Sequence, residues 1–111
     1  MKYFITNKNR KGTAYLEFYK GRWDGKSFNK DDSLFLDEDI LSDNNDFNNA
    51  ILSVLPEYDP YAITEISADQ WKEIGNVMIH KDNKNQEIYI ELNRWLQDVF
   101  QTMDCFTILG L

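Results

Sequence analysis

The chain of 111 residues lacks several features on which common function classes depend. It has one cysteine, Cys105, which excludes an intrachain disulfide and a zinc site built from several cysteines. It has one histidine, His80, so no catalytic dyad, triad or metal site within one chain can use two imidazoles. The five glycines are isolated, which excludes a glycine-rich phosphate loop.

Long hydrophobic runs are also missing. No stretch approaches the roughly 20 apolar residues of a membrane helix, and charged residues follow Met1–Thr6 too closely for a secretory signal. The composition is nevertheless 42% hydrophobic and 14% aromatic, which is enough for one packed core. We therefore expect a soluble, cytoplasmic protein in which residues 1–111 form a single domain, with no cofactor, nucleic acid or membrane as partner.

Positive charge is absent from residues 31–71, although this stretch contains eleven acidic residues. Residues 1–30 instead carry eight Lys or Arg and two acids, and the net charge of the chain is −7. One interpretation is that the acidic stretch pairs with the basic first third inside the fold. The other is that it forms a negative surface that steers a cationic partner toward the protein. The basic, aromatic first third keeps nucleic-acid binding as a minor alternative, which the pI of about 4.6 disfavours.

Hydrophobic periodicity predicts an α+β fold. Residues 2–6 and 13–19 have strand patterns, and Asp24-Gly25 predicts a hairpin turn, so we expect an N-terminal antiparallel β meander. Residues 29–46 are predicted to be an acidic loop with a short apolar strand at Leu34–Leu36.

The remainder of the chain predicts about three helices packed on a small sheet. The first helix runs to Pro56, and the second begins at Ser67 with a capping box to Gln70. A turn is expected at residues 82–85, followed by a third helix with an apolar face: Ile88, Leu92, Trp95, Leu96, Val99 and Met103. Residues 61–67 form a further candidate strand, and residues 105–109 are predicted to be a short, buried C-terminal strand.

Signals for chemistry are weak. Leu41 and Ser42 stand where an EF-hand loop needs an oxygen ligand and a glycine, so that motif is excluded. Looser binding of a divalent cation by Asp37, Glu38, Asp39 and Asp43 is an alternative, but no metal is expected. Cys105 lies in an apolar run, where it is predicted to be a small buried hydrophobe. We therefore expect no enzyme, and a small enzyme that uses paired carboxylates is the less favoured alternative.

Three segments resemble a known family: ITEISADQWKEIG, IYIELNRWLQDVF and the terminal CFTILGL. Residues 62–111, which contain them, resemble small acidic immunity proteins of bacterial contact-dependent growth inhibition and other polymorphic-toxin systems. The resemblance implies binding and neutralisation of a cognate toxin protein domain, commonly a C-terminal nuclease. Another protein-interaction module, such as an adaptor or a phage-encoded inhibitor, remains the alternative.

An acidic inhibitor can mask the active site of a nuclease, because that site must itself hold phosphates with basic residues. We therefore predict that the toxin is contacted mainly by acidic residues of the 31–71 stretch. Trp23 is added because it flanks the predicted hairpin tip, where a large aromatic residue can anchor an interface. The predicted partner-binding residues are Trp23, Asp31, Asp32, Asp37, Glu38, Asp39, Asp43, Asp46, Glu57 and Asp59.

Overall fold

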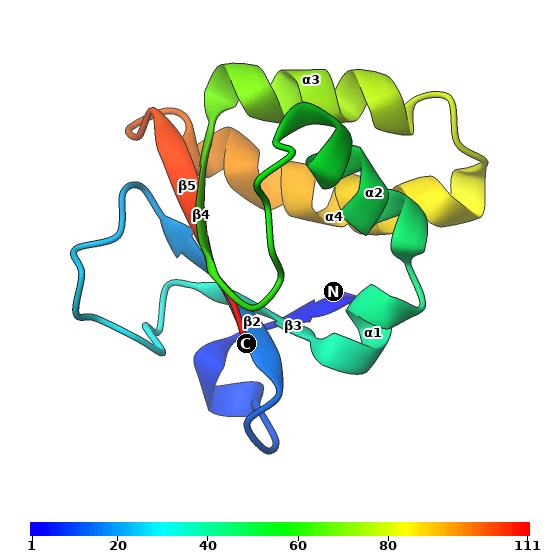
Figure 1. Cartoon of the computed structure of the whole chain (residues 1–111). Helices are drawn as coiled ribbons and strands as arrows, with labels where there is room; N and C mark the ends of the chain where they lie inside the picture. The colour runs from blue at the N-terminus through cyan, green and yellow to red at the C-terminus, as the bar shows by residue number, and fades with distance from the viewer.

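Five strands form one antiparallel sheet in the computed structural model, which describes residues 1–111 (Figure 1). The order across the sheet is β1-β3-β2-β5-β4, so β3 lies between the first two strands of the chain. The strands are β1 (Phe4–Ile5), β2 (Tyr15–Lys20), β3 (Leu34–Asp37), β4 (Ile63–Ser67) and β5 (Cys105–Leu109). The helices are η1 (Asn7–Asn9), α1 (Glu38–Ser42), α2 (Asn45–Val54), α3 (Ala68–Met78) and α4 (Asn83–Val99). The predicted α+β domain is confirmed, but its N-terminal strands do not form the predicted meander, because β3 pairs with both β1 and β2 and separates them.

Helices α3 and α4 begin at side-chain caps. The Ser67 hydroxyl accepts a hydrogen bond from Gln70 N (3.1 Å), and the Gln70 side chain accepts one from Ser67 N (2.9 Å). This confirms the predicted capping box. Asp82 accepts from Asn85 N (3.0 Å), so α4 already begins at Asn83. The turn predicted for residues 82–85 was therefore wrong, because Asp82 stabilises a helix start there.

The main core lies between one face of the sheet and helices α2, α3 and α4 (Figure 1). Trp71 of α3 is 3% exposed, and its ring lies 4.6 Å from Tyr89, 5.6 Å from Phe106 and 6.3 Å from Phe47, measured between ring centroids. Its indole N–H donates to Asn93 Oδ1 at 2.9 Å. One tryptophan therefore joins α2, α3, α4 and β5.

Residues 21–33 connect β2 to β3 as one long loop, which covers the part of the other face of the sheet around β2 (Figure 1). The hairpin predicted at Asp24-Gly25 was wrong, because no strand flanks this turn. Asp24 instead accepts hydrogen bonds from Lys26 N and from the backbone and side chain of Ser27. The bonds from Ser27, together with the one from Lys26 N, lower the pKa of Asp24 to about 2. The Asp24 side chain thus stabilises a closed loop instead of a two-stranded ladder.

Glu17 of β2 holds this loop on the sheet. Its carboxylate is buried and accepts hydrogen bonds from Asn29 N (2.6 Å), Lys30 N (3.1 Å) and Ser33 Oγ (2.7 Å). Asn29 adopts a left-handed φ of 58°, which asparagine tolerates better than most residues. Both faces of β2 are therefore covered, although its alternating sequence is typical of a strand with one solvated face.

Two expectations for the third helix need correction. Met103 lies beyond the end of α4 and is exposed, and Trp95 is only half-buried. The fully buried residues of α4 are Ile88, Leu92, Leu96 and Val99. Trp95 sits one position before Leu96 at the margin of this stripe, and Lys20 Nζ lies 5.9 Å from its ring centroid. Trp95 therefore belongs to the margin of the core.

Replacing Trp95 with alanine is expected to lower the free energy of unfolding by about 1–2 kcal/mol, because only part of the indole leaves a packed environment. Chemical denaturation monitored by far-UV circular dichroism measures this change. A loss above about 3 kcal/mol would show that Trp95 packs as a fully buried aromatic residue.

Candidate partner-binding surface

Helix α1 gathers four of the predicted site residues. Asp37 caps it by accepting a hydrogen bond from Asp39 N at 2.8 Å, and this cap explains why a helix forms where a loop was predicted. Glu38 and Asp39 occupy its first turn, and Asp43 lies at its end. Acidic side chains near a helix N-terminus stabilise the helix dipole. Part of this charge therefore has a structural role.

Most acids of the 31–71 stretch have no basic partner. Lys30 lies 3.9 Å from Asp32, Lys81 lies 3.9 Å from Asp46, and Arg22 lies 3.0 Å from Glu65. The other eight of the eleven carboxylates have no Lys or Arg nitrogen within 4 Å: Asp31, Asp37, Glu38, Asp39, Asp43, Glu57, Asp59 and Asp69. Only two of the eleven acids pair with residues 1–30, so ion pairs with the basic first third leave most of the negative charge of this stretch unpaired.

The structure divides the predicted acidic surface. Asp31 and Asp32 precede β3, whereas the α1 acids follow it, so a strand separates the two groups. Asp31 accepts a hydrogen bond from Asn7 Nδ2 at 3.0 Å. Asp46 lies in the first turn of α2 beside Lys81, and Glu57 and Asp59 lie on the loop between α2 and β4. The acids do not form one continuous segment of the fold.

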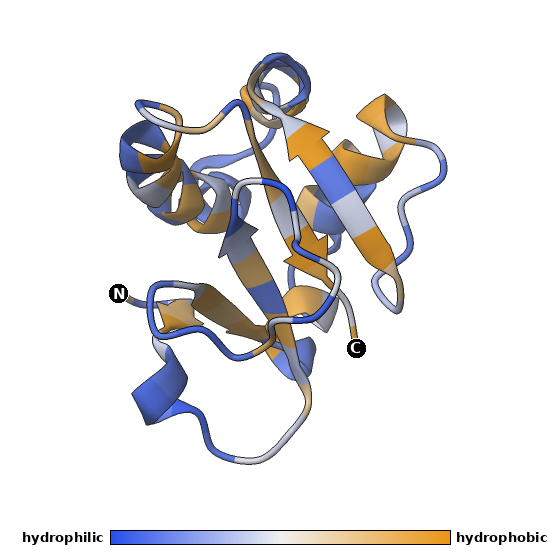
Figure 2. Ribbon diagram, turned by 90° about the vertical axis from the view of Figure 1, so that its left-hand side faces the viewer, coloured by the Kyte–Doolittle hydropathy of each residue, from blue (hydrophilic) through white to orange (hydrophobic).

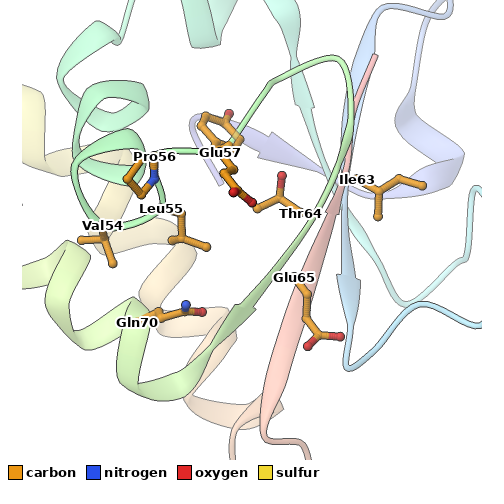
Figure 3. Close-up of a pocket in the computed structure, with 9 residues that line it drawn as sticks. Val54, Leu55, Pro56, Glu57, Ile63, Thr64, Glu65 and Gln70 are labelled. Carbon is orange, nitrogen blue, oxygen red and sulfur yellow. The ribbon is translucent and has the colours of Figure 1, made fainter.

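A groove of about 500 Å³ separates β4 from the end of α2 (Figure 3). Apolar side chains from the α2 end and the following turn form one wall, with Glu57 beside them. Thr64 of β4 contributes to the other wall, where the neighbouring Glu65 directs its carboxylate toward the outer face of the sheet, and Gln70 closes the groove at the start of α3 (Figure 3). The lining residues are Val54, Leu55, Pro56, Glu57, Tyr58, Ile63, Thr64, Glu65 and Gln70. No Lys or Arg is among them.

Of the predicted site residues, Glu57 lies in this groove, and Glu65 is a groove residue that was not among the predicted site residues. Glu65 bonds to Arg22 across the outer face of the sheet, with 3.0 Å between Glu65 Oε1 and Arg22 Nε. Ile63 points away from the groove on that outer face (Figure 3) and is half exposed. Residues 61–67 were predicted to form a strand, but their sequence did not reveal that this strand lies at the edge of the sheet.

Trp23 does not occupy a hairpin tip. Its indole N–H donates to Ser27 O at 2.7 Å, and its ring centroid lies 5.1 Å from that of Phe28. The side chain is half-buried within the 21–33 loop, whereas Phe28 is 58% exposed. Trp23 therefore has a structural role in this loop, and Phe28 is its more exposed aromatic residue.

The side chains considered for metal binding do not gather into a ligand set. No three His, Cys, Asp or Glu side chains are arranged to hold a metal ion, so the α1 acids do not form a ligand set. Burial raises the pKa of the Cys105 thiol, and the nearby Glu65 carboxylate raises it further. No helix has both the length and the apolar character required to span a membrane.

Comparison with family models, curated proteins and solved structures finds no match to this chain. The resemblance of residues 62–111 to immunity proteins therefore stays a prediction. The features available for a functional assignment are the unpaired acids, the groove and the edge strand beside it.

Proposed function

We propose that this protein is an immunity protein that binds a cationic toxin domain and neutralises it by covering its active site with an acidic surface. The observation that carries this proposal is that eight of the eleven acids in residues 31–71 have no basic partner. Concentrated charge of one sign destabilises a folded chain through self-repulsion. A partner that supplies the missing positive charge turns this repulsion into attraction and fast association.

A nuclease toxin fits this surface better than a toxin without a polyanionic substrate. Nucleases hold the phosphates of their substrate with Lys and Arg, so their active sites are regions of positive potential. An acidic protein competes for the same side chains. The segments ITEISADQWKEIG, IYIELNRWLQDVF and CFTILGL add the family resemblance that links such a protein to toxin neutralisation.

Co-expression tests the proposal directly. The C-terminal domain encoded by the gene immediately upstream is expressed in bacteria with and without this chain. We expect growth arrest by that domain alone, relief of the arrest by this chain, and a stable complex of the two purified proteins. Growth arrest without relief, or no complex, would reject the immunity function and favour another protein-interaction module.

The acids of α1 provide the first variant of the surface. The triple change Asp37→Asn, Glu38→Gln, Asp39→Asn removes three charges, and asparagine still caps the helix. We expect the association rate with the toxin domain to fall about tenfold at 0.01 M salt, where the Debye length is about 30 Å. The difference from wild type should shrink at 0.1 M salt, where the Debye length is about 10 Å. Stopped-flow mixing measures these rates.

A matched control removes the same charge elsewhere, through Glu73→Gln, Asp98→Asn and Asp104→Asn. These three acids are exposed, lie outside residues 31–71 and form no ion pair. The control should slow association less than the α1 variant, and both should change the free energy of unfolding by less than about 1 kcal/mol. Equal slowing by the two triples would show that only net charge matters and would reject the α1 surface as the contact.

A further inference from the structure

The two edges of the sheet differ in whether their outward backbone groups have hydrogen-bond partners. At the β1 edge, the Glu91 carboxylate of α4 accepts hydrogen bonds from the backbone N–H groups of Lys2, Tyr3 and Phe4 at 2.9–3.2 Å. Strand β1 is also only two residues long, and short edge strands offer little to an added strand. At the other edge, β4 pairs with β5 on one side and with no strand on its other side.

The register shows which backbone groups of β4 are free. Gly110 N donates to Ala62 O (2.9 Å) and Ala68 N donates to Asp104 O (3.0 Å). Alternate residues of an antiparallel strand direct their backbone groups to the same neighbour, so Thr64 and Ile66 also face β5. Ile63 and Glu65 therefore direct their N–H and C=O groups outward, and neither has another hydrogen-bond partner.

The groove described above runs along this free edge. In Figure 3, the Pro56–Glu57 turn stands beside β4 without pairing with it. The groove is wide enough to receive side chains, since its volume is about 500 Å³, and Val54, Leu55 and Pro56 make one wall apolar. The burial of β4, which lies at the edge of the sheet (Figure 2), alternates: Thr64 and Ile66 are buried on the face toward the helices, whereas Ile63 and Glu65 are exposed on the other face.

The charge of the edge selects one class of occupant. Glu57 and Glu65 line the groove, and no basic residue lines it. Two further acids are close in sequence to lining residues: Asp59 lies two residues after Glu57, and Asp69 directly precedes Gln70. Neither has a Lys or Arg nitrogen within 4 Å. The single cation in contact is Arg22, which reaches Glu65 from the outer face and is largely exposed. A basic segment is favoured here, and an acidic segment is repelled.

We propose that the free edge of β4 receives an extended, basic segment of the partner protein, which joins the sheet as a sixth strand. Main-chain hydrogen bonds to Ile63 and Glu65 supply the pairing, and the groove selects alternate side chains of the segment. Apolar side chains of the segment enter the groove toward Leu55, and the Lys or Arg side chains that alternate with them lie on the outer face near Glu65. This inference names the docking mode of the proposed immunity function, and it rests on that function only for the identity of the partner.

A synthetic peptide tests the edge without the toxin. The probe is a capped ten-residue peptide that alternates lysine and valine, added to the ¹⁵N-labelled protein at low salt. Amide exchange of Ile63 and Glu65 should slow at least about tenfold at saturation, because their N–H groups become bonded. Amides of Thr64 and Ile66 should change little, because they already face β5. A glutamate–valine peptide and a lysine peptide interrupted by prolines should each bind at least about tenfold more weakly.

Two changes at one residue separate backbone pairing from charge. Glu65→Gln removes the carboxylate, whereas Glu65→Pro also removes an outward N–H without taking a hydrogen bond from β5. Glu65→Pro should weaken peptide binding at least about fivefold more than Glu65→Gln. Circular dichroism checks that the Glu65→Pro variant folds. If that variant does not fold, protection of the Ile63 and Glu65 amides in the wild-type protein tests the backbone pairing instead. Binding without protection of Ile63 and Glu65, or binding centred on α1, would overturn the inference.

Growth rescue distinguishes this inference from the proposed function. If wild type and Glu65→Pro protect cells equally, the edge inference fails and the immunity function stands. If the peptide docks on β4 but the wild-type chain gives no protection, the edge inference stands and the immunity function fails.

Discussion

Replacing Trp71 with alanine is expected to lower the free energy of unfolding by about 3–5 kcal/mol. Trp71 is 3% exposed and packs against the rings of Phe47, Tyr89 and Phe106, so its removal leaves a cavity between three helices and β5. It also takes a hydrogen-bond donor from Asn93 Oδ1. Domains of this size have about 5–15 kcal/mol of stability in total, so the variant would be close to unfolding at 37 °C. Chemical denaturation gives the value.

Two comparisons show whether this loss comes from packing. Trp71→Phe keeps an aromatic ring and should recover at least half of the loss, because the remaining cavity is smaller and only the N–H bond is absent. Trp95→Ala removes the same side chain from the half-buried position on α4 and should cost far less. Equal losses for Trp71→Ala and Trp95→Ala would contradict the core assignment.

Sequence patterns predicted the elements whose causes are local. The capping box at Ser67 and Gln70, the proline after α2 and the apolar run at residues 105–109 each depend on neighbouring residues only. The structure confirms α2, α3, β4 and β5 close to the predicted bounds. Such signals are strong because caps and periodicity act within one or two turns of chain.

The structural features that the sequence did not predict depend on contacts between segments far apart in the chain. The strand pattern of residues 13–19 did not reveal that Glu17 is buried, because the loop twelve to sixteen residues later folds over it. The Asp24-Gly25 pair was read as a hairpin, although the Asp24 side chain closes a loop. An Asp-Gly pair has the same local turn preference in a hairpin and in this loop. The hydrogen bonds that Glu17 accepts from the loop distinguish the two structures.

The candidate site shows the same division. The acidic stretch was visible in the sequence, and the structure shows that few of its carboxylates have a basic partner. The role of Glu65 was not visible, because it depends on β4 being an edge strand. Strand order is set by the pairing of β5 with both β2 and β4, whose paired residues lie 38–92 positions apart in the chain. Alternation alone gives no such information.

Replacing Glu17 with leucine is expected to lower the free energy of unfolding by about 2–4 kcal/mol, even though the new side chain is apolar and similar in size. Glu17 lies opposite Phe35 on β3 and Leu109 on β5, so leucine fits among its cross-strand neighbours. Two backbone N–H groups and the Ser33 hydroxyl lose their acceptor beneath the 21–33 loop. Unmet buried donors cost more than the added apolar contact provides. Urea denaturation measures the net change.

Hydrogen exchange shows where this loss is located. The amides of Asn29 and Lys30 should lose protection in Glu17→Leu, whereas amides in the centre of α4 should keep theirs, because the helical core lies on the opposite face of the sheet. Ser33→Ala removes one of the three bonds and should cost only about 1 kcal/mol. If Glu17→Leu costs no more than Ser33→Ala and leaves the Asn29 amide protected, the loop is held by its aromatic packing around Trp23. The measured difference between the two variants therefore gives the contribution of the two backbone bonds to the Glu17 carboxylate in holding the 21–33 loop over β2.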